Sequence, residues 1–232
     1  MRLEPRALPR RAGLSGSPNH GPRRGGVLPD LVVIHFTAMG DTAAARARLR
    51  DPAAEVSAHW LISPQGSVEA LVPEDRRAWH AGAARWGSVE DVNSRSVGIE
   101  LCNDGLSPFP APQMAALERL LAGIVARHRI PPERVIGHSD CAPGRKVDPG
   151  ARFDWARLAR RGLAAAVTPE TGEAPDAARL AALAARAGYT APVGPEVILG
   201  ALRLRHRPWA RGPLDAVDMG VARALASRFP VD

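Results

Sequence analysis

The chain has 232 residues, of which 45% are hydrophobic and 24% charged, a composition that is ordinary for a soluble globular protein and excludes a fibrous or low-complexity one. The longest apolar run near the start, residues 31–36, is far too short to cross a bilayer, so we expect no membrane span. The net charge of +7 raises nucleic acid as a partner. Acidic residues are interspersed throughout, however, and no basic run is interleaved with aromatic residues, so we expect a solvated arginine-rich surface and no nucleic-acid partner.

Residues 1–30 are rich in arginine, proline and glycine and lack the apolar stretch of a secretory signal. We interpret them as an extended N-terminal arm and expect a cytoplasmic protein, although a start codon upstream of Met1 would restore export. In a reducing compartment the two cysteines, Cys102 and Cys141, are expected to be free thiols.

The next part of the chain, residues 31–166, mixes strand and helix patterns. Short apolar or β-branched runs predict strands over residues 31–37, 58–63, 67–72, 96–101 and 135–136. Capping residues or apolar residues at helical spacing predict helices over residues 41–49, 113–128 and 154–163. The order of these elements predicts an α/β domain with a mixed central sheet flanked by helices.

The composition changes again near the C-terminus. Residues 167–175 are rich in threonine, proline, glutamate and glycine, which is typical of a linker. Apolar residues then recur every three to four positions over residues 176–187, 194–205 and 214–229. This pattern predicts a small C-terminal helical domain over residues 176–232, marginally stable alone by its size.

Two histidines and one aspartate are the candidate metal ligands. His35 lies at the end of a buried strand, where an imidazole is costly unless it is paired or ligating. His138 follows a short strand, and Asp148 precedes Pro149 ten residues later. Two imidazoles and one carboxylate with an open fourth position are typical of a catalytic zinc site, although these residue types also occur as structural histidines and capping aspartates.

Lysine usage is a second chemical signal. Of the 31 lysines and arginines, Lys146 is the only lysine. A lone lysine indicates a position where a compact ammonium is needed in place of a planar guanidinium, or else it is chance.

Five segments resemble, in order and spacing, the signature blocks of the N-acetylmuramoyl-L-alanine amidases of the AmpD/AmiD type. They are VIHFT at 33–37, VSAHW at 56–60, AWHAG at 78–82, VGIEL at 97–101 and GHSDCAPGRKVDPG at 137–150. The resemblance covers about residues 17–160 and implies the mixed sheet that these amidases share with peptidoglycan recognition proteins. It also implies hydrolysis of the amide bond between the lactyl group of (anhydro-)N-acetylmuramic acid and L-alanine of the stem peptide.

The same resemblance implies roles for individual residues. His35, His138 and Asp148 correspond to the zinc ligands, Glu100 to the catalytic acid/base, and Lys146 to a lysine that stabilises the oxyanion. Zinc lowers the pKa of bound water from about 16 toward about 7, which makes a nucleophile available at neutral pH. On the residues alone, Glu100 is either this acid/base or only a hydrogen-bond partner of a ligand histidine.

Four further residues are predicted to contact substrate. His80 is expected to line the cleft, Trp79 and Trp86 either stack on sugar or peptide or belong to the core, and Asn93 is expected to contact the stem peptide. His59 is expected to be packed and hydrogen-bonded near the site.

The sequence departs from related phage-type amidases at one position. Ala58 stands where those proteins have a tyrosine, and Tyr189, the only tyrosine, lies in the helical tail, so the burden of proton transfer falls on Glu100. Cys141 is in the metal loop but not at a ligand position and is expected to be an inert thiol. His20, His128 and His206 are expected to be solvated.

The helical tail resembles, more weakly, the small peptidoglycan-binding domain of AmiD-type relatives. Its cationic and aromatic residues either face anionic stem peptides or belong to a simple packing domain; they are Arg203, Arg205, His206, Arg207 and Trp209. A tail of this kind favours intact cell wall as the substrate, whereas the absence of a signal favours cytoplasmic anhydro-muropeptides. A non-catalytic peptidoglycan-binding module is the alternative function, but such members usually lack a metal ligand that this chain retains.

Overall fold

The computed structural model describes residues 16–169 and 172–231. Within them, five strands form a mixed sheet in the order β4-β3-β6-β2-β7. Strand β2 (Leu31–Phe36) lies between β6 (Ser96–Leu101) and β7 (Val135–Gly137) and is parallel to both. Strand β3 (Trp60–Ile62) is parallel to β6 and pairs antiparallel with β4 (Val68–Ala70). This sheet, flanked by helices, confirms the predicted α/β fold class.

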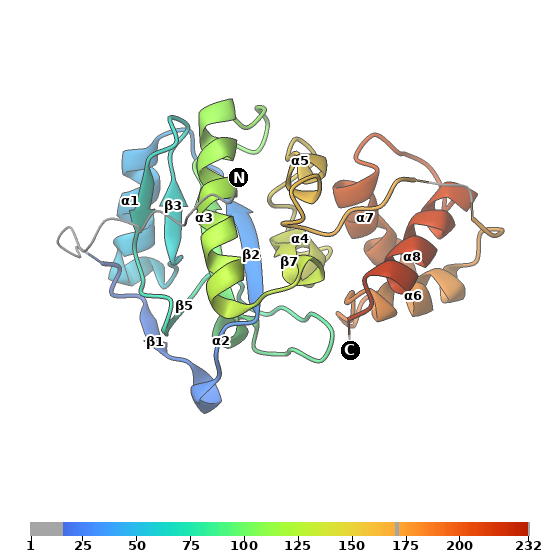
Figure 1. Cartoon of the computed structure of the whole chain (residues 1–232), viewed down its shortest axis with the longest axis horizontal. Coiled ribbons are helices and arrows are strands. Elements are labelled where there is room, and N and C mark those ends of the chain that lie inside the picture. The colour runs from blue at the N-terminus through green and yellow to red at the C-terminus, as the bar shows by residue number, and fades with distance from the viewer. Residues whose placement is uncertain (1–15, 170–171, 232) are drawn as a thin grey trace, which may run out of the picture.

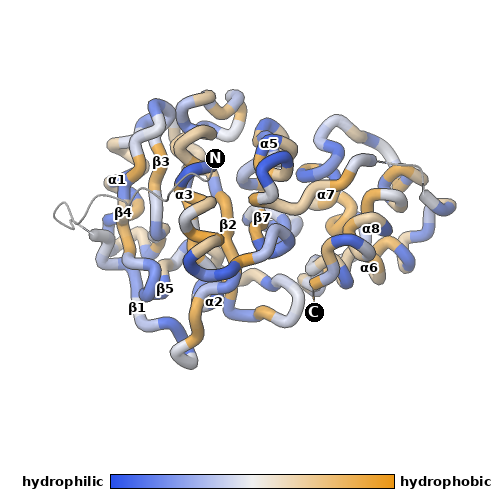
Figure 2. The backbone as a smooth tube through the Cα atoms, viewed as in Figure 1, coloured by the Kyte–Doolittle hydropathy of each residue, from blue (hydrophilic) through white to orange (hydrophobic). Residues whose placement is uncertain are grey.

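Strand β2 is the centre of the sheet, and its sequence reflects that position. Its first five residues are all buried, as expected for a parallel strand covered on both faces, which is why it shows a continuous apolar run with no alternation. Figure 2 shows β2 as a mostly hydrophobic stretch beside polar loops.

Helix α3 (Ala111–His128) covers one face of the sheet (Figure 1). Its apolar stripe, which includes Leu117 and Leu121, shares one core cluster with Ile34 and Ile99 of the sheet. Helix α1 (Thr42–Arg50) is capped at its N-terminus by Asp41, whose carboxylate accepts from the N–H groups of Ala43 and Ala44. The predicted helices over 41–49 and 113–128 are therefore present, the second beginning two residues earlier than predicted.

The remaining elements of this part are short. They are β1 (His20–Pro22), β5 (Arg76–Ala78), α2 (Val92–Arg95), α4 (His138–Cys141), α5 (Trp155–Ala159) and the 3-10 helices η1 (Arg24–Gly26), η2 (Pro52–Ala54) and η3 (Pro132–Arg134).

The predicted N-terminal arm has structure of its own within residues 16–30, because β1 pairs with β5 and Arg23 is buried among main-chain carbonyls such as that of Ser94, 2.6 Å away. Residues 1–15 of the predicted arm lie outside the described residues.

Three helices form the C-terminal part: α6 (Ala177–Arg186), α7 (Pro195–His206) and α8 (Ala216–Arg228), at the right of Figure 1. One apolar cluster joins them to the sheet, because Leu31 and Ile136 belong to the same buried set as Leu183, Ile198 and Met219. The predicted small helical domain and the catalytic domain therefore share a core across the predicted linker.

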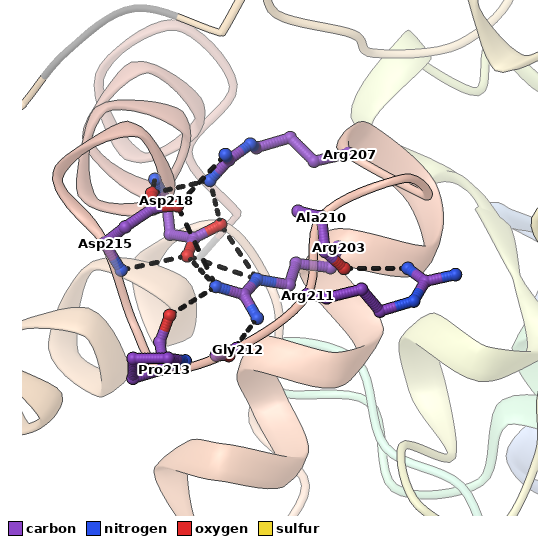
Figure 3. A network of polar contacts seen from close by, with 8 residues as sticks. All are labelled: Arg203, Arg207, Ala210, Arg211, Gly212, Pro213, Asp215 and Asp218. Carbon is purple, nitrogen blue, oxygen red and sulfur yellow. Dashed lines mark hydrogen bonds and ion pairs between the residues drawn. The ribbon is translucent and has the colours of Figure 1, made fainter.

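Of the two interpretations of the tail, the cationic face is not formed. Figure 3 shows Arg203 and Arg207 turned toward Asp218 and Asp215, with Arg203 Nη2 2.6 Å from Asp218 Oδ2 and Arg207 Nη1 2.6 Å from Asp215 Oδ1. Arg205 and His206 are buried, so the expectation of a solvated His206 is wrong as well. These cations are neutralised or covered inside the protein, and of the five residues only Trp209 is largely exposed, at 69%.

Across the part of the chain that the structure describes, no helix combines the length and the apolar character needed to span a membrane.

Candidate active site

The sheet topology brings the two histidines together. Strands β2 and β7 are parallel neighbours, so both end at the same edge of the sheet. His35 is the fifth residue of β2, and His138 directly follows the last residue of β7. The loop after α4 then returns Asp148 to this edge, where the Ser139 N–H donates to the Asp148 carbonyl at 2.9 Å.

Three side-chain atoms converge on one point. His35 Nδ1 lies 2.8 Å and His138 Nδ1 3.0 Å from Asp148 Oδ2, and the two Nδ1 atoms are 3.0 Å apart. All three residues are buried. Two imidazole nitrogens and a carboxylate oxygen facing one another cannot all be satisfied by mutual hydrogen bonds, because each bears a lone pair directed at the same point. This donor set fits a divalent metal ion.

The protonation states at this point suit a metal site. Burial and the neighbouring His138 lower the pKa of His35, the Asp148 carboxylate opposes them, and the resulting pKa is about 4, so His35 is neutral at pH 7. Burial opposes ionisation of Asp148, but its close contacts with the His138 and His35 imidazoles hold the pKa of this carboxyl well below its usual range. A neutral imidazole and an ionised carboxylate are the forms in which these side chains bind metal.

Outer hydrogen bonds fix which nitrogen of His35 faces the metal point. Ser96 Oγ donates to the Val92 carbonyl at 2.5 Å, so its lone pairs accept from His80 Nε2–H at 3.1 Å. His80 Nδ1 then accepts from His35 Nε2–H at 3.0 Å. His35 Nδ1 is thereby left with a free lone pair, as a metal ligand requires.

His138 is oriented by main chain. Its Nε2–H donates to the Ala81 carbonyl at 2.9 Å, which leaves Nδ1 as the ligand atom. The same carbonyl accepts from Arg145 Nη2 at 2.6 Å, and Asn93 Oδ1 accepts from the N–H groups of His80 and Ala81 at 3.0 and 2.8 Å. The segment around Ala81 is therefore held from both sides.

An open cleft of about 440 Å³ contains the metal point. Its lining includes the three candidate ligands together with Glu100, Lys146, Trp79, His80, Arg48 and Val147. The structure thus brings together all five residues predicted for metal binding and catalysis.

Glu100 is the half-buried acid of this cleft. It lies opposite His35 in the β2–β6 register, and its Oε2 is buried without a hydrogen-bond partner among the described residues. Burial raises the pKa of Glu100, the Asp148 carboxylate adds to this shift and the Lys146 ammonium opposes it, and together they bring the pKa to about 8. A cation bound beside Glu100 would lower this pKa toward neutral pH. At such a pKa, a carboxyl in this position can act both as a general base and as a general acid.

The four predicted substrate contacts separate into two groups. Trp79 and His80 lie at the cleft, His80 also as the support of His35. Trp86 and Asn93 do not line it. Trp86 is 2% exposed and packs against Tyr189 with ring centroids 4.9 Å apart, so it is a core residue and presents no free ring face. Asn93 is buried beneath the segment that it holds, so its contact is with main chain and not with a stem peptide.

Several functional neighbours were missed by sequence reasoning. Ser96, Arg145 and Asp140 each support a ligand histidine or its segment. Asp140 had a signal, because a charged residue in the turn that follows a buried strand and contains a candidate ligand needs a partner. Ser96 and Arg145 had none, because their contacts depend on segments distant in sequence.

His59 and Cys141 behave as expected. His59 is fully buried, accepts from the Gly98 N–H at 2.9 Å and donates to the Arg76 carbonyl at 3.0 Å. Cys141 is buried, and burial raises the pKa of its thiol far above the usual value, so it is a poor metal ligand.

A mixed sheet with two histidines and an aspartate around one point, beside the half-buried Glu100 in an open cleft, defines a candidate metal centre of the hydrolytic type. The chain matches the family model described as N-acetylmuramoyl-L-alanine amidase over residues 25–151. It is 35% identical to the N-acetylmuramoyl-L-alanine amidase AmiD of Escherichia coli K12, over 87% of this chain and 84% of that protein. The chain therefore belongs to the N-acetylmuramoyl-L-alanine amidase family, as the sequence blocks indicated.

Other relatives and solved structures agree. The 1,6-anhydro-N-acetylmuramyl-L-alanine amidase AmpD of Enterobacter cloacae is 40% identical over 44% of this chain and 55% of that protein. A structure of E. coli AmiD in complex with anhydro-N-acetylmuramic acid-L-Ala-D-gamma-Glu-L-Lys matches with a TM-score of 0.80 at 32% identity, covering 95% of this chain and 93% of the other. AmpDh3 of Pseudomonas aeruginosa in complex with anhydromuramic pentapeptide matches with a TM-score of 0.79 at 29% identity, covering 97% and 99%. These two similarities extend over the C-terminal helices.

Proposed function

We propose that this protein hydrolyses the amide bond between the lactyl group of N-acetylmuramic acid or its 1,6-anhydro form and L-alanine of the stem peptide, and that it does so with zinc held by His35, His138 and Asp148. The observation that carries the proposal is the placement of Glu100 in the same cleft as the three converging donor atoms, with its Oε2 buried and unpartnered among the described residues. Membership of the amidase family supplies the reaction.

A zinc ion at this point, when bound, supplies Lewis-acid polarisation and lowers the pKa of water. The protein's own groups do the rest. Glu100 takes a proton from the water that attacks the lactyl carbonyl, and it delivers a proton to the leaving L-alanine nitrogen. The Lys146 ammonium, which lines the cleft, stabilises the negative charge that develops on the carbonyl oxygen. Trp79 and the Val147 side chain offer apolar surface at the mouth.

The proposed natural substrate is an anhydro-muropeptide. AmiD and AmpDh3 have been solved with anhydromuramoyl peptides, and the present chain matches both over nearly its full length. The proposed compartment is the cytoplasm, where the two free thiols of Cys102 and Cys141 agree with a reducing environment. Cell fractionation with a C-terminal epitope tag tests the compartment.

The activity is tested by mass spectrometry of products. Purified protein is incubated with 1,6-anhydro-muropeptides and, separately, with intact sacculi, and Glu100→Ala and His138→Ala serve as controls. Release of free stem peptide by the wild type and by neither variant is the expected result. Binding to sacculi without release of peptide by the zinc-loaded wild type would instead identify a non-catalytic peptidoglycan-binding module.

A further inference from the structure

A buried ion pair links the C-terminal helices to the metal loop. Arg205 Nη1 of α7 lies 2.6 Å from Asp140 Oδ2 of α4, and the side chains of the two residues are 4% and 0% exposed. Charges removed from water are costly unless every polar atom around them is satisfied.

Asp140 is satisfied on both carboxylate oxygens. Its Oδ1 accepts from the Tyr189 hydroxyl at 2.9 Å, and its Oδ2 also accepts from the Gly137 N–H at 2.8 Å. Gly137 is the last residue of β7 and directly precedes His138. The carboxylate thus holds the main chain one residue before a candidate metal ligand, and two side chains from the C-terminal part hold the carboxylate.

Arg205 also fixes the strand that leads to this turn. Its Nη2 donates to the carbonyls of Val135 in β7 at 3.2 Å and Ala165 at 2.9 Å. Its guanidinium lies over the Trp155 ring, 4.1 Å from the ring centroid. One side chain therefore clamps both the beginning of β7 and the turn after its end.

The turn has little stability of its own. Helix α4 has four residues, which is a single turn, and an isolated turn of helix is unstable in water. The His138 ring is aimed by its bond to Ala81, but the position of its Cα depends on how α4 is anchored. Contacts from α7 and from Tyr189 supply that anchor.

We propose that Arg205 and Tyr189 are positioning residues for the metal site: through Asp140 they hold the His138 turn in the place that metal binding requires. The C-terminal helices are then part of the metal centre's support as well as a packing unit. The inference rests on the proposed zinc site, and its test has a readout that does not depend on amidase activity.

The test compares Tyr189→Phe, Arg205→Met and Asp140→Asn with the wild type. Tyr189→Phe is the decisive variant, because it keeps the ring that packs on Trp86 and removes only the bond to Asp140. Arg203→Met is the matched control, because Arg203 lies on the same helix but pairs with Asp218 within the C-terminal helices. Zinc affinity is measured by competition with a chromophoric chelator, and thermal unfolding of the metal-free proteins is measured in parallel.

Loss of a group that orients a metal ligand typically weakens metal binding 10- to 100-fold. We expect Tyr189→Phe to raise the zinc dissociation constant about 10-fold and to lower kcat with little change in KM, while metal-free thermal unfolding stays close to that of the wild type. Arg205→Met and Asp140→Asn should weaken zinc binding more, and Arg203→Met should leave zinc affinity unchanged.

Folded Tyr189→Phe and Arg205→Met proteins with wild-type zinc affinity would overturn the proposal, and so would an equal loss in Arg203→Met. If the wild type binds zinc tightly but releases no stem peptide, the proposed activity is wrong and this test of the positioning residues still stands. If the wild type binds no zinc, the proposed activity and the proposed positioning role are both wrong.

Discussion

Replacing Gly98 by alanine should weaken the metal site without touching a ligand. Gly98 lies in β6 directly beneath the ring of His80, and a Cβ there would fall 2.5 Å from His80 Cδ2 and 2.6 Å from Cγ. Carbon atoms in contact are ordinarily about 3.5–4 Å apart, so the ring must move by roughly 1 Å. The 3.0 Å bond from His35 Nε2 to His80 Nδ1 would then be broken or strongly bent.

The size of the effect follows from that bond. Loss of the partner of a metal-ligating histidine costs about 10- to 100-fold in metal affinity, which corresponds to about 1.4–2.7 kcal/mol. We expect a decrease of this size in the zinc affinity of Gly98→Ala, measured by chelator competition at pH 7.5. Gly200→Ala in α7, where an added Cβ meets nothing within 4 Å, is the control and should bind zinc like the wild type.

A double-mutant cycle makes the reasoning refutable. In a His80→Ala background the space beside Gly98 is empty, so Gly98→Ala should cost no further zinc affinity, whereas His80→Ala alone should reproduce the loss. If Gly98→Ala weakens zinc binding equally in the wild-type and His80→Ala backgrounds, the added methyl group does not act through His80. If Gly98→Ala is folded and binds zinc normally, the His80 support is unimportant.

The remaining predictions concern titration and the thiol. The pKa of Glu100 is raised to about 8, so in metal-free protein the folded state keeps a proton that the unfolded chain loses above about pH 4.5. The free energy of unfolding of metal-free wild type should therefore fall between pH 4.5 and 8, and that of Glu100→Gln should fall less. Equal pH dependence of the two proteins in chemical denaturation would contradict this. Burial lowers the pKa of His59 from 6.5 to about 4, so as the pH falls the unfolded chain takes up this proton before the folded protein does. The free energy of unfolding should therefore decrease by about 3 kcal/mol between about pH 6.5 and pH 4. The His59→Gln variant should lose less over the same range. The buried Cys141 thiol should resist labelling in the native protein. In elemental analysis, Cys141→Ala should retain zinc and Asp148→Ala should lose it. The reverse pattern would refute the ligand assignment.

Local sequence was sufficient for most of the fold. The β-branched run of β2 predicts a strand because a strand buried on both faces excludes polar residues. The apolar spacing of α3 predicts a helix because one face must cover the sheet. The motif blocks then placed His35, His138 and Asp148 in one site, since their resemblance to a known family carries three-dimensional information that spacing lacks.

Local sequence could not separate residues whose types are equally common in clefts and in cores. Trp86 and Asn93 were predicted at the substrate, but the ring packs on Tyr189 and the amide holds main chain. The sequence left open whether the arginines of the tail form a cationic face or belong to a packing domain, and in the structure Arg203 and Arg207 turn inward to Asp218. Which way a charged side chain turns depends on partners elsewhere in the chain.

The sequence by itself determined the family, the order of the main strands and helices and the identity of the candidate metal donors, because each of these is written in short contiguous segments. Only the tertiary structure decided that the C-terminal helices share a core with the sheet and reach Asp140 through Arg205, and that His80 supports His35. The physical reason is that these contacts join residues 45 and 65 positions apart, and a buried charge or imidazole finds its partner by proximity in space, which no local pattern records.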